Sequence, residues 1–196
     1  MHLARVDLSN QKEVLELCNS TLMEEVQSII HCAGVAHVSR LGQIDPYQLE
    51  KMFFLNSISP IILINRLLPN MISKKFGRII LVGSIVGDYG GVGLSGYSST
   101  KSALSAIVKS VNKEIQLLKK NETHSDVTIN LVKPGYCDSE MTKNMNAKVR
   151  KQIEESSTLK RFLNCEEVAR EITRLVEPES RHISGSEITI TGGQTI

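Results

Sequence analysis

The chain has 196 residues, of which 41% are hydrophobic and 22% charged, and its formal net charge at pH 7 is +2. This length suits one domain with its own core and is too short for two, so we expect a single domain over residues 1–196. The near balance of charge gives no support for nucleic-acid binding. Five residues could form local basic patches: Lys74, Lys75, Arg78, Lys119 and Lys120. Such runs of basic residues are typical of a solvated surface.

Cysteine usage and the lack of targeting signals bear on the cell compartment. Cys18, Cys32, Cys137 and Cys165 are widely spaced, and no Cys-x-x-Cys pair occurs. This pattern predicts neither a metal site nor a disulfide framework. No apolar run approaches the ~20 residues of a membrane span, and the N-terminus lacks the regions of a signal peptide. We therefore expect a cytoplasmic protein with no metal, no nucleic-acid partner and no membrane partner.

Short apolar runs alternate with longer segments of helical periodicity along the chain. Strands are predicted over residues 2–8, 28–34, 77–84, 127–135 and 186–193. Helices are predicted over residues 11–25, 46–75, 96–120 and 165–176, where apolar residues recur at three- and four-residue intervals. This alternation predicts an α/β fold with a parallel sheet covered by helices on both faces. Ligands bind such sheets beyond the carboxyl ends of the strands, where Asp7, Ser84 and residues 32–34 and 134–139 fall.

The second predicted helix contains a proline inside its pattern. Asp45 is a suitable N-cap and Pro46 suits the first turn. Pro60, however, lacks the N–H that the carbonyl of Asn56 would bond in a regular helix. We expect a kink there, with Asn56 holding a water that feeds protons towards Lys101 and Tyr97. The alternative is a helix that ends and restarts at Pro60, with Asn56 as a polar filler.

Ser84, Tyr97 and Lys101 form the set with the clearest chemistry. Ser84 ends a predicted strand, while Tyr97 and Lys101 stand four residues apart on one helix face, so that the ammonium can lie close to the phenol. A nearby cation favours phenolate and would lower the tyrosine pKa from about 10. Such a phenol exchanges a proton with a carbonyl oxygen while Ser84 hydrogen-bonds the same oxygen. The set therefore predicts hydride-transfer chemistry.

A glycine-rich stretch follows Ser84. Gly87, Gly91 and Gly93 match Gly-x-x-x-Gly-x-Gly after a strand and before a helix, as a phosphate cradle would. Because the stretch lies between Ser84 and Tyr97, we favour flexibility and close packing over phosphate binding.

Together these residues resemble the short-chain dehydrogenase/reductase family, most closely its 3-oxoacyl-[acyl-carrier-protein] reductases. The resemblance runs from about Leu3 to Gly193 and includes HCAG at residues 31–34, KPGYCDSEMT at 133–142 and ISGSEITITGG at 183–193. It implies a Rossmann-like fold, a substrate lid over about residues 136–163, and a catalytic tetrad of Asn56, Ser84, Tyr97 and Lys101. It also implies cofactor contacts at Asp7, Leu8, Cys32, Ala33, Gly34, Tyr97, Lys101, Pro134, Gly135, Cys137 and Ser139.

The chain departs from the family pattern at three places. Cys32 replaces a sheet-bracing asparagine and cannot make the same pair of amide hydrogen bonds. Ser139 replaces a lid threonine and keeps the hydroxyl. The chain also opens at what would be the third strand, without the first two strands and their Gly-rich phosphate loop. We therefore expect an N-terminally truncated sheet, in which residues 2–8 have no neighbour and residues 28–34 form an open edge.

The resemblance implies a reductase that uses NADP(H) rather than NAD(H) to convert a 3-oxoacyl thioester or related ketone to the alcohol. We expect weak cofactor binding by this chain alone. Expected partners are the small-molecule or acyl-carrier-bound ketone and further copies of the chain, as a homodimer or homotetramer. Lys75 with Lys119 and Lys120 is a candidate carrier contact, although a solvated surface also explains these lysines. Two alternatives stay open: a non-catalytic homologue that acts by oligomerisation, and a fragment of a longer active reductase.

Overall fold

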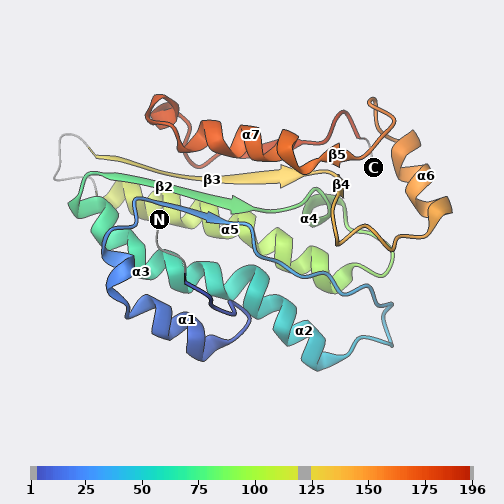
Figure 1. Cartoon of the computed structure of the whole chain (residues 1–196), viewed down its shortest axis with the longest axis horizontal. Helices are drawn as coiled ribbons and strands as arrows, with labels where there is room; N and C mark the ends of the chain where they lie inside the picture. The colour runs from blue at the N-terminus through green and yellow to red at the C-terminus, as the bar shows by residue number, and fades with distance from the viewer. Residues whose placement is uncertain (1–3, 119–124, 195–196) are drawn as a thin grey trace.

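The computed structural model describes residues 4–118 and 125–194 of the chain. In these residues the core is a four-stranded parallel sheet in the order β1-β2-β3-β6 (Figure 1). A separate parallel ladder joins β4 to β5. The predicted parallel α/β fold is confirmed. The strands run over Ser28–His31 (β1), Phe76–Val82 (β2), Asp126–Pro134 (β3), Cys137–Asp138 (β4), Leu163–Asn164 (β5) and Glu187–Ile190 (β6).

Helices cover both faces of this sheet (Figure 1). α3 and α5 pack on one face, with α1 beside α3, and α7 packs on the other. Alternate residues of β2 show the two layers, because Ile79 and Leu81 join the core of α1, α3 and α5, whereas Ile80 joins that of α7. The helices run over Gln11–Cys18 (α1), Pro46–Phe53 (α2), Ser59–Ser73 (α3), Val86–Tyr89 (α4), Ser95–Leu118 (α5), Ala147–Glu155 (α6) and Cys165–Val176 (α7), with 3₁₀ turns over Thr21–Glu24 and Pro178–His182.

The N-terminal region departs from the prediction. Residues 4–7 form no strand, and the next two residues lie in a turn before α1, where Asp7 accepts hydrogen bonds from the N–H and hydroxyl of Ser9. A strand needs a neighbour for its backbone groups, and in the described part of the chain this segment has none. Within the same residues β1 pairs with β2 alone, which confirms the open edge, and Ile30 on that edge is 46% exposed.

The second predicted helix is continuous but distorted. α2 passes into a π turn over Phe54–Ile58, in which the Ser59 N–H bonds the Phe54 carbonyl five residues back, and α3 follows directly. The wider turn accommodates Pro60, which has no N–H to donate. The predicted distortion is confirmed, and the break at Pro60 is excluded.

Contrary to expectation, the segment Pro46–Ser73 is long and apolar enough to cross a membrane, although half of its most apolar window is buried in this fold.

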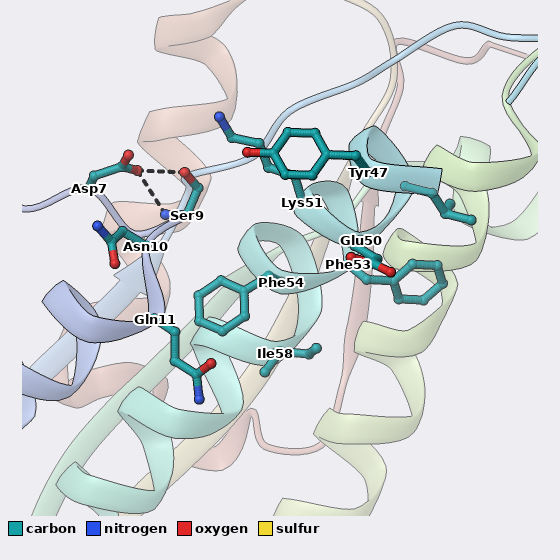
Figure 2. Close-up of a pocket in the computed structure, with 11 residues that line it drawn as sticks. Asp7, Ser9, Asn10, Gln11, Tyr47, Glu50, Lys51, Phe53, Phe54 and Ile58 are labelled. Carbon is teal, nitrogen blue, oxygen red and sulfur yellow. Dashed lines mark hydrogen bonds between the residues drawn. The ribbon is translucent and has the colours of Figure 1, made fainter. Parts of the chain in front are cut away.

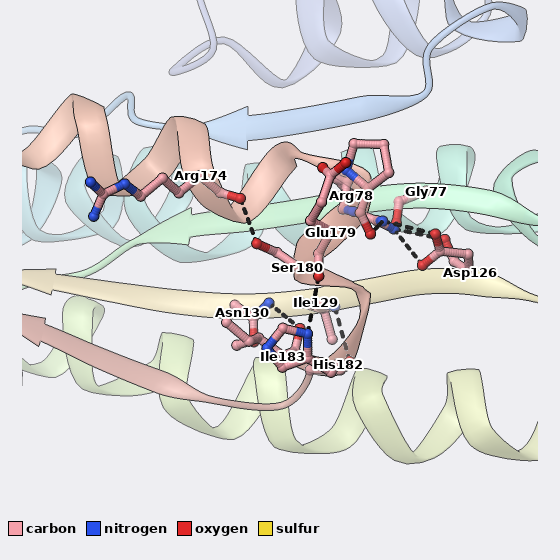
Figure 3. A network of polar contacts seen from close by, with 12 residues as sticks. Gly77, Arg78, Asp126, Ile129, Asn130, Arg174, Glu179, Ser180, His182 and Ile183 are labelled. Atoms are coloured by element: carbon pink, nitrogen blue, oxygen red, sulfur yellow. Dashed lines mark hydrogen bonds and ion pairs between the residues drawn. The ribbon is translucent and has the colours of Figure 1, made fainter.

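Arg78 is buried at the start of β2 and is not part of a basic patch. Its side chain has no exposed surface, and its two terminal nitrogens donate to the Asp126 carboxylate at 2.9 Å (Figure 3). The guanidinium also lies over the Phe76 ring, 4.5 Å from its centroid. The expectation of a solvated arginine is therefore wrong, since this ion pair ties the first residues of β2 and β3 together. Lys119 and Lys120 lie outside the described residues.

Asp126→Asn is expected to lower the free energy of unfolding by about 3 kcal/mol, because it leaves a fully buried guanidinium without its anionic partner. Chemical denaturation at pH 7 measures this. The matched control is Glu171→Gln, which removes an exposed pair with Arg174 on α7 and should change the value by less than about 1 kcal/mol. An equally small change for Asp126→Asn would show that the fold does not depend on the buried pair.

Candidate active site

The carboxamide of Asn56 is fully buried and makes three hydrogen bonds. It accepts from the Val35 N–H and donates to the Val35 carbonyl, both at 2.9 Å. It also donates at 2.9 Å to the hydroxyl of Thr100, which in turn donates to the Tyr97 carbonyl at 2.7 Å. The π turn is thereby clamped to the loop after β1 and to α5. Sequence reasoning missed Thr100, for which the available signal was its place three residues after Tyr97.

Ser84 and Tyr97 meet beyond the carboxyl end of β2. The Ser84 hydroxyl accepts from the Val86 N–H at 3.2 Å, at the start of α4. Tyr97 is 9% exposed, and its phenol lies close enough to Ser84 for this residue to influence its pKa. Burial raises the pKa of Tyr97; Ser84 lowers it, and Tyr136 and Cys137 raise it further. The phenol therefore keeps its proton at neutral pH.

Lys101 follows Tyr97 by one helical turn and is 6% exposed. Its Nζ donates to the Val82 carbonyl at 2.9 Å and lies 6.0 Å from the centroid of the Tyr97 ring. Burial lowers the pKa of Lys101 to about 8, and the charge of Cys32 opposes this change. The prediction that Lys101 lowers the pKa of Tyr97 is therefore wrong, because burial dominates both groups and the ammonium is bonded to a strand carbonyl.

Gly34 lies against two members of the predicted tetrad. A Cβ at this position would come within 3.2 Å of both Asn56 Oδ1 and Lys101 Nζ. A side chain at this position would thus push against both polar groups, and glycine lets the backbone after β1 approach them closely. Through this contact, the Thr100 link and the proximity of Ser84 to Tyr97, the structure brings Asn56, Ser84, Tyr97 and Lys101 together at the carboxyl ends of β1 and β2.

The Gly-x-x-x-Gly-x-Gly stretch does not form a phosphate cradle. Gly87 lies inside the short helix α4, and its N–H donates to the Ser84 carbonyl at 3.0 Å. A Cβ on Gly87 would come within 3.0 Å of the Ser102 nitrogen. Gly93 has a φ of 76°, and its carbonyl accepts from the Ser39 N–H at 2.8 Å. The stretch packs α4 onto α5 and joins it to the loop after β1.

The residues predicted to frame a nicotinamide lie beside the tetrad at the end of β3. The Pro134 carbonyl accepts from the Ile85 N–H at 3.1 Å, which joins β3 to the segment that carries Ser84. Cys137 is near enough to Tyr97 to raise its pKa, and Cys32 is near enough to influence Lys101. Of the other nicotinamide-side residues, Gly135 donates its N–H to the Ile190 carbonyl and Ser139 is exposed in the lid. Ala33, predicted on the adenine and diphosphate side, is half-buried in the loop after β1.

Asp7 and Leu8 lie apart from the tetrad. Asp7 lines a cavity of about 760 Å³ between the start of α1 and the side of α2, together with Tyr47 and Phe54 (Figure 2). Hydrogen bonds from Ser9 hold the pKa of Asp7 below its usual range, and Leu8 packs against the core. None of the tetrad residues, all of which the structure describes, lines this cavity. Of the predicted adenine-side residues, Asp7 therefore lines a cavity that no tetrad residue lines, whereas Gly34 lies against Asn56 and Lys101.

The predicted lid contains α6 and the β4–β5 ladder. Arg150 of α6 pairs with Asp138 at 2.6 Å and lies over the Phe162 ring, 4.2 Å from its centroid. The Tyr136 ring contacts Phe162, with centroids 5.5 Å apart, and packs against the cluster that contains Tyr97. Tyr136 is thus a site residue that sequence reasoning missed. The available signal was an aromatic residue directly after the Pro-Gly turn.

A buried, protonated phenol beside a serine hydroxyl and a buried ammonium, at the ligand-binding edge of a parallel sheet, defines a site for proton transfer to or from a carbonyl or alcohol oxygen. The family model that matches the chain, over residues 1–150, is described as short chain dehydrogenase. The chain belongs to this family and is an oxidoreductase of the short-chain dehydrogenase/reductase type.

Curated relatives include 3-oxoacyl-[acyl-carrier-protein] reductase FabG of Buchnera aphidicola subsp. Schizaphis graminum, 27% identical over 96% of this chain and 75% of the relative. The uncharacterized oxidoreductase YmfI of Bacillus subtilis is 28% identical over the same shares of the two chains. Among solved structures, 4-hydroxyisoleucine dehydrogenase complexed with NADH has a TM-score of 0.87 at 22% identity, covering 98% of this chain and 78% of that one. This last likeness shows the fold.

Proposed function

We propose that the protein is an NAD(P)H-dependent reductase that converts a ketone of the 3-oxoacyl thioester class to the alcohol, with Tyr97 as the proton donor. The observation that carries this proposal is the placement of the buried Tyr97 phenol close to Ser84, with Lys101 Nζ 6.0 Å from the centroid of the Tyr97 ring. Similarity to FabG reductases supports the substrate class. Preference for NADP(H), an acyl-carrier-bound substrate, assembly as a homodimer or homotetramer and a cytoplasmic location belong to the same proposal and rest on the resemblance.

The nicotinamide end of such a cofactor fits the residues present. One of the three N–H donors of Lys101 is bonded to Val82, which leaves donors for ribose hydroxyls. Gly34 keeps space open in front of that ammonium. Pro134 and Cys137 lie alongside, at the end of β3. When bound, the cofactor supplies the hydride.

The chain's own residues handle the proton. Because burial raises the pKa of Tyr97, the phenol is protonated at neutral pH and can donate to the substrate oxygen. The Ser84 hydroxyl stabilises the same oxygen as negative charge builds on it. We assign the Lys101 ammonium to the nicotinamide ribose rather than to the phenol, since it is not among the groups that lower the pKa of Tyr97. Asn56 fixes α5, the helix that carries Tyr97 and Lys101, through its bond to Thr100. We also propose that the backbone carbonyl of Asn56 holds a water that returns protons to this site.

The diphosphate end of the cofactor has no matching cradle in the glycine-rich stretch, whose Gly87 N–H is bonded within the protein. We therefore expect the dissociation constant of NADPH and the isolated chain to lie above about 1 micromolar, a level that corresponds to a binding free energy of roughly −8 kcal/mol. Titration followed by nucleotide fluorescence or calorimetry measures this. The matched control is the same chain joined to the N-terminal strand-loop-helix of a FabG reductase, which should recover binding. Micromolar binding by the isolated chain would contradict the expectation.

A non-catalytic homologue that acts by assembly is the second candidate. It is favoured by an apolar groove of about 310 Å³ between α3 and α5, along which Ile61 is 47% and Leu118 51% exposed. Assay of NADPH oxidation with a 3-oxoacyl thioester separates the two candidates. Turnover that requires Tyr97 supports the reductase. A protein that binds NADPH but does not turn over supports the assembly role. A fragment of a longer reductase would gain activity only with the added segment.

A further inference from the structure

His31, the last residue of β1, is 3% exposed and has no part in the proposed chemistry. Its Nε2 lies 3.2 Å from the hydroxyl of Ser59, which is also fully buried. That hydroxyl donates to the Leu55 carbonyl at 2.9 Å. The Ser59 proton is thus already used, so Nε2 must carry a proton and act as the donor. The result is a directed chain from imidazole N–H to hydroxyl to carbonyl.

The Leu55 carbonyl relies on this chain because the π turn takes away its α-helical backbone donor. The Ser59 N–H, its partner in an α-helix, bonds the Phe54 carbonyl. Its partner in a π-helix would be residue 60, which is proline and has no N–H. A buried carbonyl left unpaired is costly, so the Ser59 side chain replaces the missing donor. His31 in turn satisfies the Ser59 oxygen and fixes its direction.

We propose that His31 is a positioning residue of the Tyr97 site, which acts through Ser59 and the Leu55 carbonyl to hold the π turn that presents Asn56. The proposal rests on the proposed function only in that Asn56 belongs to the active site. Asn56 directly follows Leu55, and its side chain clamps Val35 and Thr100. A shift of the π turn therefore moves the contact between the loop after β1 and α5.

The imidazole is suited to this role because it stays neutral. Burial lowers the pKa of His31 to about 4, and the neighbouring Lys101 charge lowers it further, against a backbone hydrogen bond that raises it. A neutral imidazole donates from Nε2 without placing a second cation beside the Lys101 ammonium. His31, the first residue of the HCAG sequence, thus supplies an uncharged hydrogen-bond donor whose side chain is long enough to reach the Ser59 hydroxyl.

Hydrogen exchange of the Val35 amide tests the proposal in the protein without cofactor. Val35 lies in a loop and is 36% exposed, so its protection depends on the bond to Asn56 Oδ1 rather than on burial. His31→Leu, of similar volume but without a donor, is expected to reduce that protection about tenfold. His31→Gln, whose amide reaches a similar point, should retain it. The Leu131 amide, bonded to Ser186 in β3, serves as the internal reference and should stay unchanged in both variants.

Unchanged Val35 protection in His31→Leu, or equal losses in His31→Leu and His31→Gln, would overturn the proposal. Imidazole ¹⁵N shifts of the wild-type protein at pH 7 test it without any variant, since a neutral ring protonated at Nε2 is expected and one protonated at Nδ1 would overturn it. In an active preparation, His31→Leu should lower kcat with little change in KM. Because exchange and ¹⁵N shifts need no turnover, a protein that passes both but reduces no ketone, even when joined to the N-terminal strand-loop-helix, would refute the proposed function and leave the role of His31 standing.

Discussion

Tyr97→Phe is expected to lower kcat/KM for reduction of a 3-oxoacyl thioester by ~10²–10⁴-fold, the range for loss of a general acid. The change removes one hydroxyl and almost no volume, and the ring stays among Met52, Val86 and Tyr136. The fold should therefore be retained. Steady-state rates with NADPH measure the effect, in the isolated chain or, if its turnover is too slow, in the chain with the restored N-terminal segment.

Tyr47→Phe is the matched control, since this phenol is 68% exposed on α2 and makes no part of the tetrad. Its rate should stay within about twofold of wild type, in line with the small effects of surface substitutions. If Tyr97→Phe behaved in the same way, with unchanged circular dichroism, the proton donor would have to be another group.

Amphipathic periodicity was sufficient to locate the strongest elements. Residues 165–176 form α7 with the predicted bounds, because an apolar stripe at helical spacing meets the sheet and Asn164 with Glu167 forms a capping box. The sheet strands β1, β2, β3 and β6 also lie where short apolar runs predict them. By contrast, α6 has no buried residue, and its apolar face is too short to mark it as a helix from sequence.

Tertiary context decided what periodicity could not. The β-branched and apolar residues near Val6 suit a strand, yet a strand exists only with a neighbour, and none pairs with this segment in the described residues. The sequence indicates a surface charge at Arg78, because its buried ion pair with Asp126 forms only when the fold brings the two residues together. The direction of the Tyr97 pKa was also missed, because spacing along a helix gives the distance to Lys101 but not the burial of both groups. The placement of Asn56, Ser84, Tyr97 and Lys101 near one another was predictable, because the family resemblance joins ordered, separate motifs; their catalytic roles stay a prediction.

Lys101→Met is expected to abolish turnover and at the same time to stabilise the protein without cofactor by about 2 kcal/mol at pH 7. Burial lowers the pKa of Lys101 from its ordinary 10.5 to about 8, which corresponds to about 3 kcal/mol of destabilisation while both states are protonated. Loss of the hydrogen bond to Val82 offsets about 1 kcal/mol of the gain. A site that holds a buried cation for chemistry is thus expected to lower stability.

The pH dependence of this difference identifies its cause. Between about pH 8 and 10.5 the unfolded chain holds the Lys101 proton and the folded chain releases it, so wild-type stability rises with pH through this window. The advantage of Lys101→Met should shrink over the same range, as measured by urea unfolding at each pH. Lys113→Met, on the exposed side of the same helix, should change stability by no more than about 0.5 kcal/mol at any of these pH values. A Lys101→Met protein that is less stable than wild type at pH 7, or whose advantage does not vary with pH, would show that burial of the ammonium is not the dominant effect at this site.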